Sequence, residues 1–270
     1  MQPSTASPDR IRFDQPKAGL QRLSARFGGH AYDLHRHETY AVGLTIWGAQ
    51  SFHYRGSLRT SRAGQVMIIH PDEAHDGHAG VDRGFAYRML YVDPGAVGAA
   101  LEDAPPPFVP EVVTEDPVLS ALLGEAFGDF PRPLEPLAQD AIVGRLAERL
   151  AARSDGRRLR PGPAARRAVA LARDFLDAEA HRTVASEELE RLSGLDRFAL
   201  ARHFRTVHGT SPHRYQVGRR LLEAQRLIAE GMKPAKAAAT TGFADQSHLT
   251  RHFAARFGMT PGRWATLARA

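Results

Sequence analysis

Short runs of alternating apolar and polar residues fill the first third of the chain. Val42, Leu44 and Ile46 alternate with smaller residues, Gly48 interrupts this run, and it resumes over residues 51–55. Further short apolar runs lie at 66–69 and 87–92. Short strands spaced about ten residues apart and separated by Gly and Pro turns are typical of a small barrel or jelly roll. We therefore expect residues 22–94 to be all-β, with a loose arm over about 1–20 before them.

The apolar spacing changes to that of helices after residues 104–107, where Ala-Pro-Pro-Pro predicts a stiff connector. Residues 118–126 fit one apolar stripe, which begins with Val118, and residues 137–152 carry a second. Residues 154–163 are polar and contain Pro and Gly, which indicates a linker between domains. The remaining chain predicts helices over 165–178, 186–192, 196–207, 212–229, 234–240 and 245–257, and a short one from Pro261.

The helical region contains one unit twice. Leu-Ala-Arg-His-Phe at 200–204 is matched by Leu-Thr-Arg-His-Phe at 249–253, and Gly209 is matched by Gly258. The offset is 49 residues at each of these positions. A repeat of this length indicates one supersecondary unit used twice. Each copy has the pattern of a helix, a turn containing Gly and a second helix, which predicts a pair of helix-turn-helix units.

The residues that begin and end the helices also repeat. Gly194 and Gly242 stand at the turns between helices, where a positive φ costs glycine little. The predicted N-caps are Asp196, Ser211, Asp245 and Thr260. In each copy the Leu and the Phe are four residues apart and share a core-facing side, so Arg202 and Arg251 lie away from the core.

Residues 165–269 resemble the DNA-binding domain of AraC/XylS-type bacterial transcription regulators. The segment GFADQSHLTRHF at 242–253, followed by FGMTP at 257–261, is close to that family's signature. Two positions depart from it: Glu190 stands where a small residue is usual, and Ala201 leaves the first recognition helix without one polar group. The resemblance implies that residues 212–229 form the helix that connects the two units and fixes their spacing.

The N-terminal region resembles a cupin, specifically the effector-binding domain of many AraC-type regulators. The resemblance rests on His-Arg-His-Glu at 35–38 and on the segment from Gly64 to His75. The cupin metal motif also has a Glu four or five residues after the second His, where this chain has Ala41 and Val42. The resemblance implies a domain over 1–153 whose helices at about 117–152 lie on the barrel and contribute a dimer contact, a linker over 154–163, and a DNA-binding domain over 164–270. The alternative is that these helices only cover the barrel.

Composition and charge agree with this division. The chain of 270 residues has no cysteine, which excludes disulfides, thiolate metal sites and thiol nucleophiles and fits a reducing cytosol. Residues 164–270 carry 18 Lys and Arg against 10 Asp and Glu, and residues 1–163 carry 18 against 20. A basic C-terminal half is expected to bind a polyanion. Residues 1–9 lack the pattern of a signal peptide, and no apolar run is long enough to span a bilayer, so we expect a cytoplasmic protein.

Recognition helices enter the major groove with their first turns against base edges. By resemblance, the base-facing positions are Arg197, Phe198, Ala201 and Arg202 in the first helix and Gln246, Ser247, Thr250 and Arg251 in the second. The candidate phosphate contacts are Arg205, Arg214, Arg256 and Arg263. Arg can bind guanine through two hydrogen bonds, and Gln can bind adenine in the same way. Two alternatives remain open: the arginines are solvated surface residues, and Phe198 belongs to the core.

Polar and aromatic residues of the barrel are candidates for effector binding. They are His35, His37, Glu38, Tyr40, Trp47, His75 and Arg88. The three histidines could hold Zn²⁺ or Fe²⁺ through imidazole nitrogens. The absence of the motif's Glu argues against a metal, so we expect no metal and no cofactor. Whether these residues line a small-molecule pocket or bond among themselves is open at this stage.

The sequence thus predicts a two-domain transcription regulator that is not an enzyme. We expect DNA, a small-molecule effector and a second copy of the chain as partners, with RNA polymerase as a further one. The family resemblance favours activation over repression. One rival is a metal-dependent cupin enzyme, such as a dioxygenase, with a DNA-binding tail, which stoichiometric iron or zinc would favour. The other is a ligand-free regulator whose barrel only dimerises, which a barrel filled with side chains would favour.

Overall fold

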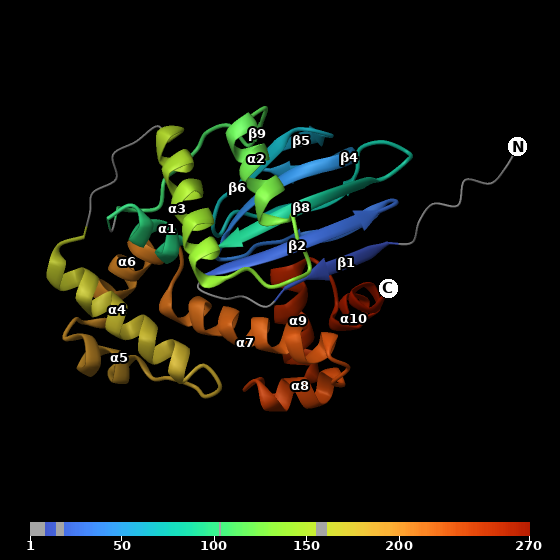
Figure 1. Ribbon diagram of the computed structural model, residues 1–270. Helices are drawn as coiled ribbons and strands as arrows, with labels where there is room; N and C mark the ends of the chain where they lie inside the picture. The colour runs from blue at the N-terminus through green and yellow to red at the C-terminus, as the bar shows by residue number, and fades with distance from the viewer. Residues whose placement is uncertain (1–8, 15–18, 103, 155–160) are drawn as a thin grey trace, which may run out of the picture.

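The computed structural model describes residues 9–14, 19–102, 104–154 and 161–270, and it shows a β-rich domain followed by a helical domain (Figure 1). The expectation about a signal peptide falls largely on residues 1–8, and most of the predicted linker falls on residues 155–160. Both segments lie outside the described residues. Among the described residues, no helix combines the length and the apolar character needed to cross a bilayer.

The strands of the first domain are all antiparallel. They are β1 (Arg10–Phe13), β2 (Leu20–Phe27), β3 (His30–His35), β4 (Tyr40–Tyr54), β5 (Ser57–Arg62), β6 (Val66–Ile69), β7 (His75–Ala79), β8 (Phe85–Val92) and β9 (Val113–Thr114). The order β1-β2-β8-β4-β6-β9 forms one layer, and β3, β7, β5 and the second half of β4 form the other. The expected cupin-like β domain is confirmed.

The 15-residue strand β4 joins the two layers. Its first half pairs with β6 and β8, and its second half pairs with β5 and β7. The pairing register shifts between Thr45 and Trp47, and Gly48 follows with a φ of 71°. A Cβ at Gly48 would lie 2.0 Å from the carbonyl oxygen of Gly84, so only glycine fits this bend.

The expected loose arm over residues 1–20 is wrong in part. Residues 10–13 form β1, which pairs with β2 in register from Arg10 with Arg26 to Phe13 with Leu23. The ring of Phe13 lies 4.9 Å from that of Trp264 in the helical domain. Ile11 is fully buried. The segment is too short to show a clear alternation in sequence, and its order comes from these distant contacts.

Three helices cover the outer face of the first layer (Figure 1). They are α1 (Pro94–Ala100), α2 (Pro117–Ala126) and α3 (Pro136–Ala152), of which α1 was not predicted. The stripe of α3, namely Ile142, Val143, Leu146 and Leu150, is buried against the sheet as the apolar spacing predicts. Val118 does not belong to the stripe of α2, because it is 52% exposed on the side away from the sheet.

The helical domain confirms the duplicated unit. Its helices are α4 (Pro163–Ala178), α5 (Ser186–Ser193), α6 (Arg197–His208), α7 (Pro212–Ala229), α8 (Pro234–Thr240), α9 (Gln246–Phe257) and α10 (Pro261–Arg269). All four predicted N-caps accept a hydrogen bond from a backbone N–H in the first turn of their helix. Gly194 and Gly242 have φ values of 70° and 79°, as the turns require.

Candidate functional site

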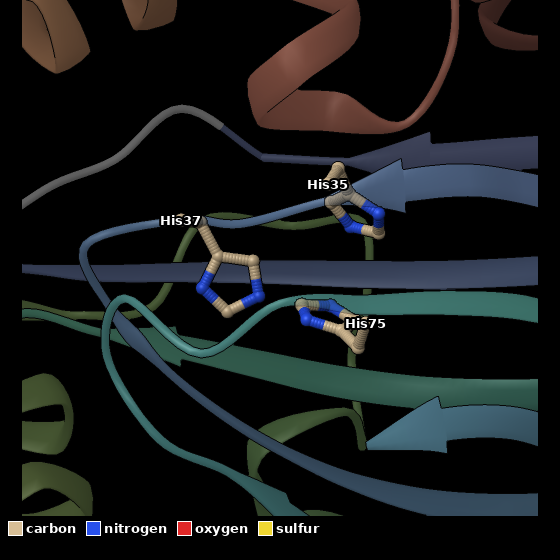
Figure 2. A group of neighbouring side chains, drawn as sticks. All are labelled: His35, His37 and His75. Carbon is tan, nitrogen blue, oxygen red and sulfur yellow. The ribbon is translucent and has the colours of Figure 1, made fainter. Parts of the chain in front are cut away.

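Three buried imidazoles gather at the end of the β domain that faces the helices (Figure 2). His35 ends β3, His37 follows in the loop, and His75 begins β7. One ring nitrogen of each lies within 4.8 Å of the others. Each Nδ1 is also 2.8–3.0 Å from a backbone carbonyl oxygen, that of Asp33, Thr39 or Glu73. The structure therefore brings together the three histidines that the sequence singles out.

Burial keeps these imidazoles neutral. Removal from water lowers the pKa of His75 to about 4 and holds those of His35 and His37 well below the ordinary value. A positive charge on one ring would also repel the others and Arg256, which acts in the same direction on His35 and His37. The three Nδ1 contacts are those of neutral rings that donate from Nδ1.

This burial predicts a loss of stability in mild acid. The folded-state pKa of His75 lies below the unfolded value of about 6.5, so the unfolded chain binds more protons between these values. The contribution is complete above pH 6.5 and is lost as the pH falls towards 4. Between pH 6.5 and pH 5, His75 alone should lower the free energy of unfolding by roughly 2 kcal/mol. Urea unfolding in chelator-containing buffer measures this loss.

Two variants check the cause of that pH dependence. His75→Gln should flatten the slope of the unfolding free energy between pH 6.5 and pH 5. His53→Gln changes an exposed histidine of the same domain and should leave the slope as it is. Equal slopes in the wild type and His75→Gln would contradict the assignment of the loss to the buried imidazole.

Three of the seven candidate effector residues lie elsewhere, which corrects the prediction. Tyr40 points to the helix-covered face, where its hydroxyl donates to the carbonyl of Pro107 at 2.6 Å. The guanidinium of Arg88 lies 5.6 Å from the ring of Phe127 in the segment after α2. Trp47 is 37% exposed and lies beneath the guanidinium of Arg26, 4.4 Å from its ring centre. Because side chains alternate along a strand, the sides of these residues follow from the pairing register.

The residues that do accompany the histidines include tyrosines that the sequence analysis missed. Along β8, Tyr87, Met89 and Tyr91 alternate with Arg88 and face the interior. The ring of Tyr91 lies 5.2 Å from that of His37, and the Tyr87 hydroxyl bonds to that of Tyr32 at 2.5 Å. The alternation of 87, 89 and 91 was visible in the sequence, but which of the two sides faces inward was not.

A cavity of about 80 Å³ lies between the histidines and the helical domain. Its apolar walls include Leu20, Leu23, Tyr91, Leu222, Phe257 and Trp264. Its polar lining includes Gln21, His35, His37, Glu38, Arg219, Gln225 and Arg256. Buried side chains such as Phe52, Tyr54 and Met67 occupy the centre of the β domain. The space is therefore at the boundary between the domains, with both domains supplying its walls.

Glu38 meets Arg256 of α9 at this boundary. The two side chains form an ion pair and are only 14% and 7% exposed. Burial lowers the pKa of Arg256 to about 10. Gly218 lies in the middle of α7, and a Cβ there would be 3.0 Å from both charged groups, so its lack of a side chain makes room for the pair. Glu38 thus has a role that its place in the sequence did not reveal.

The predicted phosphate contact of Arg256 is wrong, because its side chain points into the boundary between domains. Two other candidates also contact the β domain: Arg214 pairs with Asp72, and Arg263 donates to the carbonyl of His30 at 2.7 Å. Arg205 is exposed. Phosphate contact by Arg205, Arg214 and Arg263 stays a prediction.

Backbone hydrogen bonds also join β3 to the end of α9. The N–H of Asp33 donates to the carbonyl of Gly258 at 2.8 Å, and that of Arg36 donates to Ala255 at 3.1 Å. Gly258 has a φ of 64°, and a Cβ there would lie 2.8 Å from Nδ1 of His35. The strand that carries His35 is therefore attached directly to the second recognition helix.

The first turns of α6 and α9 reach the surface, as base-reading helices require. Phe198 is 76% exposed, which rules out its alternative assignment to the core. The remaining base-facing candidates are exposed or half-buried: Arg197, Ala201, Arg202, Gln246, Ser247, Thr250 and Arg251. The guanidinium of Arg197 bonds to Glu187 and Glu190, so base contact there requires release from these carboxylates. Base contact by all eight residues stays a prediction.

Arg220 of α7 holds the two helix-turn-helix units together. Its guanidinium donates to the carbonyls of Ala180 and Arg182 at 2.6 Å each, on the first unit. It also donates to that of Gly242 at 3.1 Å, on the second. Arg220 is 9% exposed. These bonds fix α7 to both units, which supports the connecting role inferred from the resemblance.

Two family models match the chain, one on each domain. Residues 17–147 match the AraC-like ligand binding domain, and residues 189–266 match a helix-turn-helix domain. The uncharacterized HTH-type transcriptional regulator YbfI of Bacillus subtilis is 26% identical over 231 residues, which cover 83% of this chain and 84% of YbfI. The probable transcriptional regulator LumQ of Photobacterium leiognathi is 29% identical over 102 residues, 37% of this chain and 41% of LumQ.

Solved structures of ToxT from Vibrio cholerae share the two-domain fold. One superimposes with a TM-score of 0.66 at 9% identity, covering 93% of this chain and 99% of ToxT. Another, which holds an unsaturated fatty acid, has a TM-score of 0.63 at 11% identity and covers 99% of this chain and 97% of ToxT. The family models on both domains and the duplicated helix-turn-helix unit agree, and this chain belongs to the AraC-type helix-turn-helix transcriptional regulators.

Proposed function

We propose that a small molecule bound between the two domains controls how strongly this regulator binds DNA. The observation that carries the proposal is the cavity whose walls come from both the β domain and helices α7 and α9. A ligand in that place contacts both domains at once, so its affinity differs between arrangements of the domains. Such a difference is what an effector needs in order to shift the population of arrangements.

The lining supports a small, mostly apolar ligand that carries a polar group. Leucine and aromatic side chains supply most of the wall, and histidine, arginine and glutamine side chains supply a few hydrogen-bonding groups. This is the usual composition of a small-molecule site. A cavity of about 80 Å³ holds only a small ligand, so a larger one would require the domains to separate. The fatty acid in ToxT is consistent with an elongated apolar ligand in this fold.

The contacts of Arg214 and Arg263 with the β domain support a link between this cavity and DNA. Both residues are candidate phosphate contacts, and both are bonded to Asp72 or the carbonyl of His30. A ligand that loosens the domain boundary would free them, and each added phosphate contact raises affinity for all DNA sequences.

The proposal keeps further parts of the sequence-based prediction. We propose a homodimer, for which the exposed Val118 and Leu137 on α2 and α3 offer apolar surface. As a transcription regulator the protein would work in the cytoplasm, with RNA polymerase as a possible partner when it activates. We propose no enzymatic activity.

Ligand screening with a cavity-filling variant tests the proposal. Small organic acids and neutral molecules are screened for those that raise the melting temperature of the full chain, and each is then tested for its effect on DNA affinity. Leu222→Trp, which fills the cavity, should abolish both effects. Leu171→Trp, at a 42% exposed position on α4, is the matched control and should keep both. A ligand whose effect on DNA affinity survives Leu222→Trp would place the effector site elsewhere.

A further inference from the structure

The histidine cluster has one set of nitrogens already committed to the backbone. Nδ1 of His35, His37 and His75 contacts the carbonyl oxygens of Asp33, Thr39 and Glu73. A neutral ring that donates from Nδ1 carries its free electron pair on Nε2. Metal-binding histidines are commonly held in this way, with the second ring nitrogen donating to a carbonyl that fixes the tautomer and the ring orientation.

One of these electron pairs has no partner. Within the described part of the chain, Nε2 of His37 is buried and makes no hydrogen bond. Leaving a buried polar atom unsatisfied costs about 1–3 kcal/mol, so its retention calls for an explanation. Figure 2 shows the rings of His37 and His75 side by side with His35 above them, which places the unpartnered nitrogen inside the cluster.

We propose that His35, His37 and His75 bind one divalent transition-metal ion of the Zn²⁺ type. Nitrogens bound to a tetrahedral Zn²⁺ at about 2.0–2.1 Å lie about 3.4 Å apart. The observed ligand atoms lie within 4.8 Å, so small rotations of the imidazoles bring them to bonding distance. Three imidazoles without a carboxylate suit Zn²⁺, Co²⁺ or Cu²⁺ better than Mg²⁺ or Ca²⁺, and Glu38 is engaged by Arg256.

The ion would keep an open coordination position. Three protein ligands leave a fourth position of a tetrahedral ion for water or another oxygen donor. His35 and His37 also line the cavity between the domains, so this position faces the space where we propose that the effector binds. A carboxylate or hydroxyl group of an effector could occupy it. This last step rests on the proposed function, whereas metal binding itself does not.

The test uses the full chain without a polyhistidine tag, stripped with a chelator and then titrated with Zn²⁺ by calorimetry and with Co²⁺ by visible absorption. One equivalent of each ion should bind, and Co²⁺ should give the d–d bands of a four-coordinate site. His37→Gln and His75→Gln should each weaken Zn²⁺ binding by about 100-fold or more, because even the loss of an outer hydrogen-bond partner costs about 10–100-fold. His53→Gln is the matched control and should bind as the wild type does.

Circular dichroism of each variant in chelator shows whether it folds, and either of the two ligand variants suffices if the other does not. The absence of Zn²⁺ and Co²⁺ binding to the folded wild type would overturn the proposal. Equal Zn²⁺ affinity in the wild type and a folded ligand variant would overturn it too, since the ion would then sit on surface histidines. Metal binding that persists while no small molecule changes DNA affinity would support the metal site and count against the proposed effector control.

Discussion

Glu38→Gln is expected to lower the free energy of unfolding by about 3–5 kcal/mol, because removing one member of a buried ion pair leaves the other charge without compensation. Here the remaining charge is Arg256, which is only 7% exposed at the domain boundary. The same change should loosen the contact between the domains and increase the affinity for DNA. Chemical unfolding measures the first effect, and titration of a DNA fragment at fixed salt measures the second.

A second substitution separates the charge from the shape of the side chain. Arg256→Met in the Glu38→Gln background removes the uncompensated charge and should recover most of the lost stability, since apolar replacements of buried pairs are often neutral. Glu73→Gln is the control: it breaks an ion pair with Arg55 inside the β domain whose side chains are 32% and 38% exposed. That change should cost no more than about 1 kcal/mol. A Glu38→Gln variant no less stable than Glu73→Gln would show that the pair at the boundary does not hold the domains.

Arg202→Ala and Arg251→Ala should each relax the preference for bases at a different position of the DNA site. The two residues occupy equivalent exposed positions in α6 and α9, and Arg220 fixes both units to α7. Successive major grooves on one face of DNA are about 10 base pairs apart, so the two affected positions should differ by about one turn. Each change should cost roughly 1–3 kcal/mol on the best site and much less on random DNA. Selection from randomised DNA with each variant measures both effects.

Arg205→Ala provides the comparison for those two variants. Arg205 is exposed on α6 and is a candidate phosphate contact, so its loss should weaken binding to all sequences alike and reduce the salt slope by about one unit. Arg214 would serve less well, because it also pairs with Asp72 of the β domain. If both base-contact variants lose preference at the same base pair, the two units do not read successive grooves.

The helical domain could be predicted from sequence because its signals are local. Each cap, turn glycine and four-residue spacing in α6 and α9 lies within one turn of the helix that it specifies. The caps Asp196 and Asp245 and the turns at Gly194 and Gly242 are all confirmed. The duplication adds a second, independent reading of each signal.

The site at the domain boundary could be predicted only in part, because it depends on pairings between distant residues. The cluster of His35, His37 and His75 follows from the cupin resemblance. The pairing of Glu38 with Arg256 joins residues 218 positions apart, and no local pattern indicates it. Tyr40 and Arg88 were assigned to the wrong side because strand alternation gives two faces without saying which one is inward.

The buried pair also limits how freely this regulator can exchange its halves with relatives by recombination. Glu38 belongs to one half of the gene product and Arg256 to the other. A recombinant that joined this β domain to a DNA-binding domain without a cation at that position would bury a lone carboxylate, at a cost of several kcal/mol. The two halves should therefore be inherited as a unit, and a new DNA specificity should arise by substitutions on α6 and α9 more readily than by domain replacement.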